Sequence, residues 1–295
     1  MTAKKSMPVT LTLVRHGESE SNAVKRAAEK GNPHPNEKKL MMEHTSRRRL
    51  TPRGVRQAQR AGEWIHRYFD LNADYRDGGS QIHGYFSPYV RAAETARHLG
   101  LPIMWRSDAR LTERNWCDLD QLTYEERQIK YSNIENRELH GIYWPAGNGE
   151  TLQMLSTRMW QHFDMLKRRH SDHHVIQVSH GETMLVERYM LERWLPEDVV
   201  HMMLSTDTEL SQKVLNQPCD WQNKIINCRI VQYSRIRPDG TLAKNYERVR
   251  LVAPSDPDNS KMNLDWQPIV RKEFTSNDLQ KYVDRFPHFL SENTE

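Results

Sequence analysis

Two β-rich runs of this sequence end in the same tripeptide, His-Gly-Glu. The first run, residues 9–14, leads into Arg-His-Gly-Glu at 15–18, and the second, residues 175–178, leads into Ser-His-Gly-Glu at 179–182. Open α/β sheets bind ligands at the carboxyl ends of their strands, and a glycine there allows a sharp turn or a close approach of the backbone. Two such strands would bring two imidazoles to one pocket.

A third strand-to-helix junction adds a cation. The apolar run 82–86 is followed by Ser87 and Pro88, which we predict to be the N-cap and first residue of a helix. Arg91 then falls in the first turn of that helix. The Arg-His pair of the first run likewise indicates an anion held beside a nucleophile or base. Each tripeptide alone is equally compatible with a surface loop that carries an incidental histidine.

Six motifs, taken in order, resemble those of the histidine phosphatase (phosphoglycerate mutase-like) superfamily. They are residues 15–19 with Asn22, 50–54 with 57–58, 87–88 with 91–96, 111–114, 149–151 and 179–182. Together they span residues 9 to about 190, and six motifs in the same order argue against coincidence. The resemblance implies an α/β fold, a three-layer α/β/α structure with a mostly parallel central sheet.

The composition is that of a soluble globular protein. The chain has 295 residues, of which 37% are hydrophobic and 28% charged, which is enough for a sizeable core. No apolar stretch approaches the roughly eighteen residues of a membrane span, and the basic N-terminus lacks the apolar region of a signal peptide. The three cysteines show no CxxC spacing, which fits a reducing compartment. We therefore expect a cytoplasmic protein without a membrane partner.

We predict one catalytic domain and a tail. The domain covers residues 8–253, with lid insertions at about 23–50 and 106–149, and the tail covers 254–295 with one helix at 276–286. The predicted strands are 9–14, 82–86, 102–105, 175–179, 225–236 and 246–252, and the main helices begin near 52, 88, 124, 151, 183 and 197.

Phosphoryl transfer needs a nucleophile, a cage of donors for three anionic oxygens, and an acid for the leaving group. A neutral imidazole can attack phosphorus, and His16 is the candidate. Arg15 and Arg91 supply planar, permanently charged forks, and His180 would donate a further hydrogen bond that strengthens in the transition state. The resemblance assigns the same roles to these four positions.

Three further residues of the matching motifs are predicted to bind phosphate or substrate. Asn22, six residues after His16, could add a neutral donor, and Ser19 and Gly181 lie in the two His-Gly motifs. The resemblance offers no firm role for Glu18.

The resemblance points to Glu113 as the catalytic acid. That role requires a raised pKa, from partial burial or from the phosphate charge. The alternative is a surface ion pair with Arg114 or Arg110. Many family members have a glycine at the position that Cys117 occupies here, after Trp116.

The sequence favours a phosphatase over a mutase. Residues 114–128 do not resemble the basic and aromatic stretch that follows the acid in cofactor-dependent mutases. We predict a metal-independent phosphomonoesterase, a histidine acid phosphatase, that forms a phosphohistidine on a small phosphorylated metabolite or nucleotide. No metal and no cofactor are expected, because the arginines do the work of a cation. A mutase-type phosphotransferase and a non-catalytic scaffold that binds a phosphorylated ligand are the alternatives.

The net charge of +4 includes one dense basic cluster at residues 47–60. We interpret this cluster as a solvated surface. The alternatives are a funnel for an anionic substrate and a nucleic-acid site, whose binding would depend steeply on salt. A homodimer is compatible with the sequence, and the substrate is left open.

Overall fold

The computed structural model describes residues 6–71, 82–130, 141–207, 211–212, 215, 217–256 and 260–286. Its principal elements, in chain order, are β1 (Thr10–Arg15), α1 (Glu20–Glu29), α2 (Glu37–Met42), α3 (Pro52–Phe69), β2 (Ile82–Phe86), α4 (Val90–His98), β3 (Trp105–Ser107), α5 (Tyr124–Lys130), α7 (Leu152–Arg169), β4 (His174–Ser179), α8 (Gly181–Glu192), α9 (Pro196–Thr206), β5 (Ile230–Ser234), β6 (Arg248–Val252), β7 (Leu264–Pro268) and α11 (Ser276–Val283).

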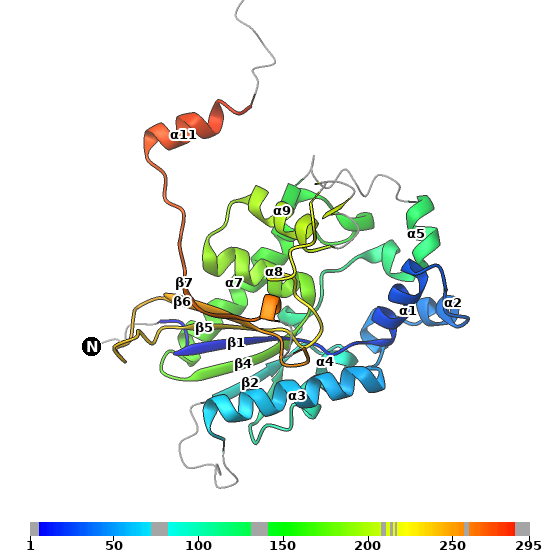
Figure 1. The fold of residues 1–295 in the computed structure, drawn as a ribbon, viewed down its shortest axis with the longest axis horizontal. Coiled ribbons are helices and arrows are strands. Elements are labelled where there is room, and N and C mark those ends of the chain that lie inside the picture. Colours follow the sequence, from blue (N-terminus) through cyan, green and yellow to red (C-terminus); the bar gives the residue numbers. More distant parts are fainter. Residues whose placement is uncertain are drawn as a thin grey trace, which may run out of the picture.

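The described strands form one sheet between two layers of helices (Figure 1). The strand order is β3-β2-β4-β1-β5-β6-β7. Strands β3, β2, β4 and β1 pair in parallel with one another, whereas the pairs β1–β5, β5–β6 and β6–β7 are antiparallel. Helices α3 and α4 cover one face, and α7, α8 and α9 lie on the other. The predicted α/β/α fold is confirmed, with a mixed sheet that is parallel around β1, β2 and β4.

Both faces of the sheet are buried because its strands carry apolar residues in both directions. Leu13 packs into the core under α7 and α8, while its neighbour Val14 packs into the core under α3 and α4. Val175 and Ile176 of β4 divide in the same way. Continuous apolar strands of this kind are typical of sheets covered on both sides.

Pairing brings the carboxyl ends of the central strands together. Arg15 at the end of β1 pairs with Ser179 at the end of β4, and Phe86 at the end of β2 pairs with Val178. The residues that follow continue the alignment, since His16 N donates to Ser179 O at 3.0 Å and Ser87 N to Val178 O at 2.9 Å. The three predicted junctions therefore meet at one edge of the sheet.

Several element boundaries differ from the sequence prediction. Residues 225–229 do not continue the strand that we predicted over 225–236, and Cys228 has a positive φ of 56°. The short third strand lies at Trp105–Ser107 rather than at 102–105, after a turn in which Ile103 N donates to Leu101 O. We placed no helix in the insertion 23–50, but it contains most of α1 and all of α2.

Helix starts were predicted with mixed success. Thr51 caps α3 with Pro52 as the first helical residue, and Thr151 caps α7. Helix α4 begins at Val90 without a side-chain cap, so Ser87 is not its N-cap. The helix that we predicted to begin near 124 corresponds to α5, and residues 131–140 after it lie outside the described residues.

The C-terminal segment contributes to the sheet. Strand β7 pairs with β6, so the sheet extends past residue 253, where we predicted a tail to begin. Helix α11 stands away from the body (Figure 1), and ion pairs from Lys272 to Asp198 and from Arg285 to Glu197 link this region to α9. None of the described helices is both long and apolar enough to cross a membrane.

Candidate active site

His16 and His180 face each other at the carboxyl ends of β1 and β4. Their ring centroids are 5.1 Å apart in an edge-to-face arrangement, and both side chains are buried. Adjacent parallel strands with aligned ends produce this contact, as the two His-Gly-Glu motifs predicted.

The surroundings of His16 fix its tautomer and its charge. Its Nδ1 lies 2.7 Å from the carbonyl oxygen of Gly17, which can only accept, so Nδ1 carries the proton and Nε2 the lone pair. Burial, then the positive charges of Arg91 and Arg15, lowers the pKa of His16 well below its usual value. A neutral imidazole with an available Nε2 is the nucleophilic form.

Two buried guanidinium groups flank the histidines. The Nε of Arg91 donates to His16 Nε2 at 3.2 Å, and its Nη1 donates to the carbonyl of Thr45 at 2.6 Å. Burial lowers the pKa of Arg91 to about 10, which leaves it charged at neutral pH. Arg15 donates to the carbonyl of Ile225, but its buried Nε has no hydrogen-bond partner within the described part of the chain. A buried N–H without an acceptor is costly, and an anion between these groups would satisfy it.

His180 is held by residues from β2's end. Its Nε2 lies 2.8 Å from the hydroxyl of Ser87, and Tyr89 packs edge-on against the ring with centroids 5.1 Å apart. The guanidinium of Arg91 lies over the Tyr89 ring. Burial, followed by the positive charge of Arg91, lowers the pKa of His180 well below its usual value. We predicted Ser87 as a helix cap and did not single out Tyr89, so these contacts were missed.

Glu113 lies beside the histidine and arginine groups. One carboxylate oxygen accepts from Arg114 N at 3.1 Å and lies 3.4 Å from both N and Oγ1 of Thr183, in the first turn after His180. Burial raises the pKa of Glu113, and the charge of Glu182 adds to that effect against the opposing effect of Arg91. The predicted alternative, a surface ion pair with Arg114 or Arg110, is not formed in the structure.

The loop that carries Glu113 is fixed by two arginines. Arg114 is buried and donates to the carbonyl groups of Glu150 and Trp144, both at 2.6 Å. Arg158 of α7 holds the Glu150 carboxylate with Nε and Nη2 at 2.7 and 2.9 Å, and donates to the Glu113 carbonyl at 3.2 Å. The Gly-Glu-Thr motif at 149–151 thus positions the acidic loop.

Ser19 and Asn22 belong to the start of α1. Ser19 is the N-cap, and its backbone N and hydroxyl lie 3.1 and 3.0 Å from Asn22 Oδ1. Asn227 also donates to that oxygen at 3.2 Å. Ser19 is therefore committed to the helix cap rather than aimed at a ligand. Gly181 is the first residue of α8, where an added Cβ would only touch Arg15 at ordinary distance.

The turn after His16 packs directly against the start of α3. A Cβ on Gly17 would lie 2.4 Å from the carbonyl oxygen of Gly54, and a Cβ on Gly54 would lie 2.1 Å from that of Glu18. The buried Glu18 carboxylate accepts hydrogen bonds from Arg26 and from Thr51, which lower its pKa although burial alone would raise it. Glu18 thus has a positioning function that the sequence did not reveal.

A segment near the C-terminal end of the domain completes the site. The carbonyl of Ile225 accepts from Arg15, Asn227 Nδ2 donates to His16 O at 3.1 Å, and Cys228 N approaches the carbonyls of both Arg15 and His16. Burial raises the pKa of the Cys228 thiol, which keeps it protonated. No motif pointed to this segment, because its apolar residues resemble the beginning of a strand.

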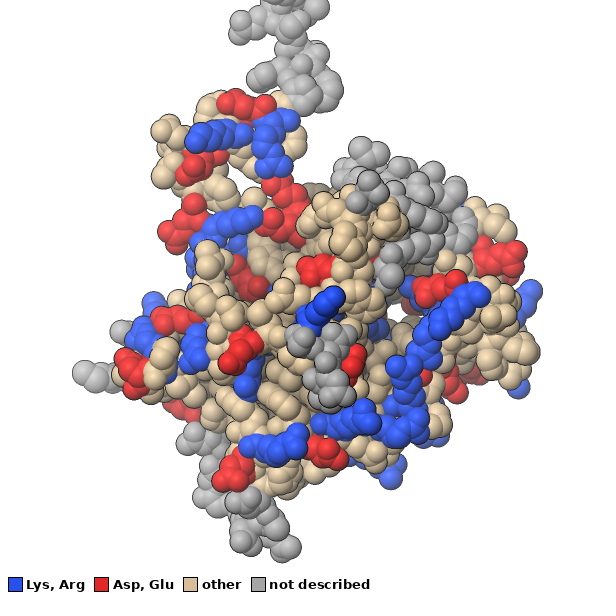
Figure 2. Space-filling view, viewed as in Figure 1, with Lys and Arg blue, Asp and Glu red and all other residues tan. Residues whose placement is uncertain are grey.

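The basic cluster at 47–60 divides into buried and exposed parts. Arg48 is only 3% exposed and donates to the Asp120 carbonyl at 2.7 Å, whereas Arg49 pairs with Glu94. The remaining arginines lie at the surface on and before α3, where Figure 2 shows a band of basic residues that continues toward α1.

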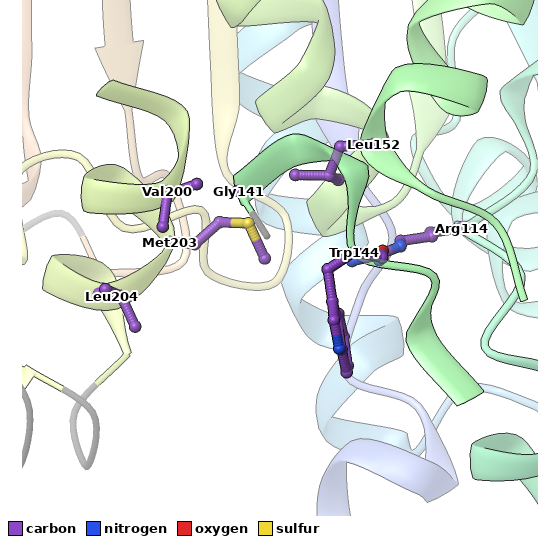
Figure 3. Close-up of a pocket in the computed structure, with 7 residues that line it drawn as sticks. All are labelled: Arg114, Gly141, Trp144, Leu152, Val200, Met203 and Leu204. Carbon is purple, nitrogen blue, oxygen red and sulfur yellow. The ribbon is translucent and has the colours of Figure 1, made fainter. Parts of the chain in front are cut away.

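A small apolar pocket lies next to the acidic loop but apart from the histidines. Figure 3 shows Val200, Met203 and Leu204 of α9 on one side and Trp144 with Arg114 on the other; Gly141 and Leu152 complete its lining. The charged groups of the candidate site do not converge there, so we do not place the chemistry in this pocket.

Comparisons with known proteins follow the same lines. Residues 11–222 match the histidine phosphatase superfamily (branch 1). The phosphoglycerate mutase-like protein AT74 of Arabidopsis thaliana is 27% identical over 64% of this chain, which spans 58% of that relative's length. The 2,3-bisphosphoglycerate-dependent phosphoglycerate mutase of Sinorhizobium fredii is 25% identical over 70% of this chain and 91% of its own length.

Solved structures share the fold at lower identity. The mycobacterial glucosyl-3-phosphoglycerate phosphatase superimposes with a TM-score of 0.54 at 18% identity, covering 76% of this chain and 92% of that one. The phosphoserine phosphatase of Entamoeba histolytica gives 0.52 at 18%, covering 76% and 89%. The chain belongs to the histidine phosphatase superfamily, as its motifs predicted, and the match places it in branch 1.

Proposed function

We propose that this protein is a metal-independent phosphomonoesterase that acts through a phosphohistidine on His16. The observation that carries the proposal is the convergence of a neutral His16, with its lone pair on Nε2, with two buried guanidinium groups and a half-buried Glu113. A dianionic phosphate would take the N–H that Arg91 now donates to His16 and so release the nucleophile. It would also provide an acceptor for the buried Arg15 Nε.

The first half of the reaction transfers the phosphoryl group to the protein. His16 Nε2 forms a bond to phosphorus, the ester P–O bond breaks, and Glu113 gives its proton to the leaving oxygen. The raised pKa of Glu113 favours the protonated form that this step needs. Arg15, Arg91 and His180 stabilise the charge that builds on the equatorial oxygens.

The second half returns the protein to its starting state. Water attacks phosphorus, the N–P bond breaks, and the ionised Glu113 accepts a proton from the water, so that inorganic phosphate leaves. The charged and aromatic surroundings of the histidines, with Tyr89 against the His180 ring and the Arg91 guanidinium over the Tyr89 ring, support a small phosphorylated metabolite or a nucleotide as substrate.

The test is phosphate release from an aryl phosphate and a panel of metabolite phosphates in the presence of EDTA. Wild type should turn over, His16→Ala should be inactive, and His34→Ala, which changes an exposed histidine, should match wild type. An inert wild type, or an active His16→Ala, would refute the proposal. Acid-labile phosphate trapped on His16 would support the intermediate directly.

A phosphotransferase of the mutase type is the second candidate, favoured by the similarity to bisphosphoglycerate-dependent mutases. Protein that carries a labelled phosphoryl group should be mixed with a phosphoglycerate acceptor, and the fate of the label should be measured. Release of the label as inorganic phosphate supports the hydrolase, whereas transfer to the acceptor supports the mutase. A stable phosphohistidine with neither outcome, or ligand binding without phosphorylation, would instead support the scaffold.

A further inference from the structure

Three histidines cluster at the opposite end of the sheet from His16. His83 lies near the start of β2, His170 is the C-cap residue of α7, and His173 immediately precedes β4. One ring nitrogen from each lies within 4.8 Å of the others. His83 lies 87 residues before His170 and 90 residues before His173, so no local sequence pattern joins the three.

The distances fit a metal ion after a small adjustment. Zinc–nitrogen bonds of about 2.1 Å place two ligand nitrogens about 3.4 Å apart in a tetrahedron. The ring centroids of His83 lie 4.2 Å from His170 and 4.8 Å from His173, and those of His170 and His173 are 5.7 Å apart. His83 and His173 are partly exposed, so rotation of their side chains can close the remaining gap.

His170 presents an unused nitrogen in this cluster. The residue is 6% exposed, its Nε2 lies 2.8 Å from the Tyr85 hydroxyl, and its buried Nδ1 has no hydrogen-bond partner within the described residues. The Tyr85 hydroxyl also lies 3.7 Å from the sulfur of Met165. If that hydroxyl donates to the sulfur, it accepts from Nε2–H, and Nδ1 is left with its lone pair. Metal-binding histidines commonly donate their second N–H in this way.

His173, which is partly exposed, also has a ring nitrogen without a partner among the described residues. Its Nδ1 is likewise buried without a hydrogen-bond partner in the described structure. Two of the three residues therefore offer a buried ring nitrogen that no described group occupies.

We propose that His83, His170 and His173 form a binding site for one divalent transition-metal ion, with zinc the best fit and water as the fourth ligand. Three imidazoles with an open position suit zinc, copper or nickel rather than calcium or magnesium, which prefer oxygen. The ion would join β2, the end of α7 and the start of β4. The proposal is independent of the proposed function.

Positive charge nearby limits the affinity. Arg106 Nη1 lies 3.4 Å from His83 Nδ1, and Arg169 adds a charge that acts on His170. Because Arg106 contacts Nδ1, the ion would bind His83 through Nε2. The proton of the imidazole would then be on Nδ1, so Arg106 could no longer donate to that nitrogen and would have to move away. Arg106→Ala should bind the ion several-fold more tightly than wild type.

The test uses the full chain, stripped with a chelator and then titrated with Zn²⁺ by calorimetry and with Co²⁺ by visible absorption. Wild type should bind one equivalent with a tetrahedral cobalt band, whereas His83→Ala and His173→Ala should lose it. His34→Ala should retain it, and so should His16→Ala, which shows that the ion is not at the active site.

Two results would overturn the proposal. One is a wild type that shows neither heat nor a cobalt band; the other is a band that survives in both His83→Ala and His173→Ala. Zinc should raise the melting temperature of wild type by mass action but not that of His83→Ala, and circular dichroism checks that each variant is folded. Phosphate release in EDTA should be equal in wild type and His83→Ala, so failure of this site leaves the proposed function untouched.

Discussion

The two ends of the central strands carry histidines in opposite chemical settings. At the carboxyl ends, His16 and His180 lie among arginine forks and hydrogen-bond donors. At the amino ends, three imidazoles lie close together, and the buried Nδ1 atoms of His170 and His173 have no hydrogen-bond partner among the described residues. We therefore propose that the same side chain binds an anion at one end and a cation at the other, because its neighbours determine which ligand it can receive.

The largest difference between the two ends should be seen in catalysis. His16→Ala removes the nucleophile and should lower kcat for phosphate release by about a thousandfold or more, whereas His83→Ala should retain the wild-type rate. Stopped assays with equal amounts of folded protein measure both. Comparable losses of kcat in the two variants would show that the two ends do not have separate roles.

The acid should matter most where the leaving group is poor. Glu113→Gln should slow hydrolysis of an alkyl phosphate by roughly a hundredfold or more, because the ester oxygen then departs without a proton. The rate of hydrolysis of a nitrophenyl phosphate, whose phenolate leaves readily without a proton, should fall much less. Glu125→Gln changes an exposed carboxylate on α5 and serves as the control. Equal losses on both substrates would indicate a role for Glu113 other than proton donation.

At the other end of the strands, the hydrogen bond between Tyr85 and His170 can be removed without changing the histidines themselves. Tyr85→Phe preserves the ring but deletes the hydroxyl that contacts His170 Nε2, and it should weaken zinc binding about tenfold. Calorimetry gives the affinity, and Tyr143→Phe, at an exposed tyrosine, is the matched control. Unchanged binding would mean that the hydroxyl does not orient the ligand.

The smallest effect concerns pH. An ordinary imidazole is about three-quarters protonated at pH 6, but burial and the arginines lower the pKa of His16 well below that range. The raised pKa of Glu113 acts in the same direction, since acidification protonates the acid. Activity should therefore hold or rise from pH 7 to pH 6, as kcat/KM profiles can measure. A fall with a midpoint near 6.5 would show an unperturbed histidine.

The parts of the site that the sequence predicted lie in short segments with strong local patterns. Runs of apolar residues that end in His-Gly place the histidines, and pairing of adjacent parallel strands then requires them to meet. Thr51 and Pro52 mark the start of α3 because capping depends on local backbone geometry alone.

The parts that it missed depend on contacts between distant segments. Residues 225–229 alternate like a strand, but hydrogen bonds from Cys228 to the end of β1 take them out of the sheet. Serine is a common helix cap, yet the hydroxyl of Ser87 forms a hydrogen bond with His180 instead. Strand β7 has no strong pattern and is recognised only by its pairing with β6.

The position of β1 between β4 and β5 has a consequence for how the chain is made. Thr10 contacts a partner on β4 that lies 164 residues later, and Thr12 contacts one on β5 that lies 220 residues later. Pairings over such distances form slowly, and a nascent chain exposes its unpaired edges until they form. The strand that leads to His16 is the first of the described strands to leave the ribosome, but it gains its second neighbour only after β5 has been made. Synthesis must therefore pass β5 before any copy of the site can exist.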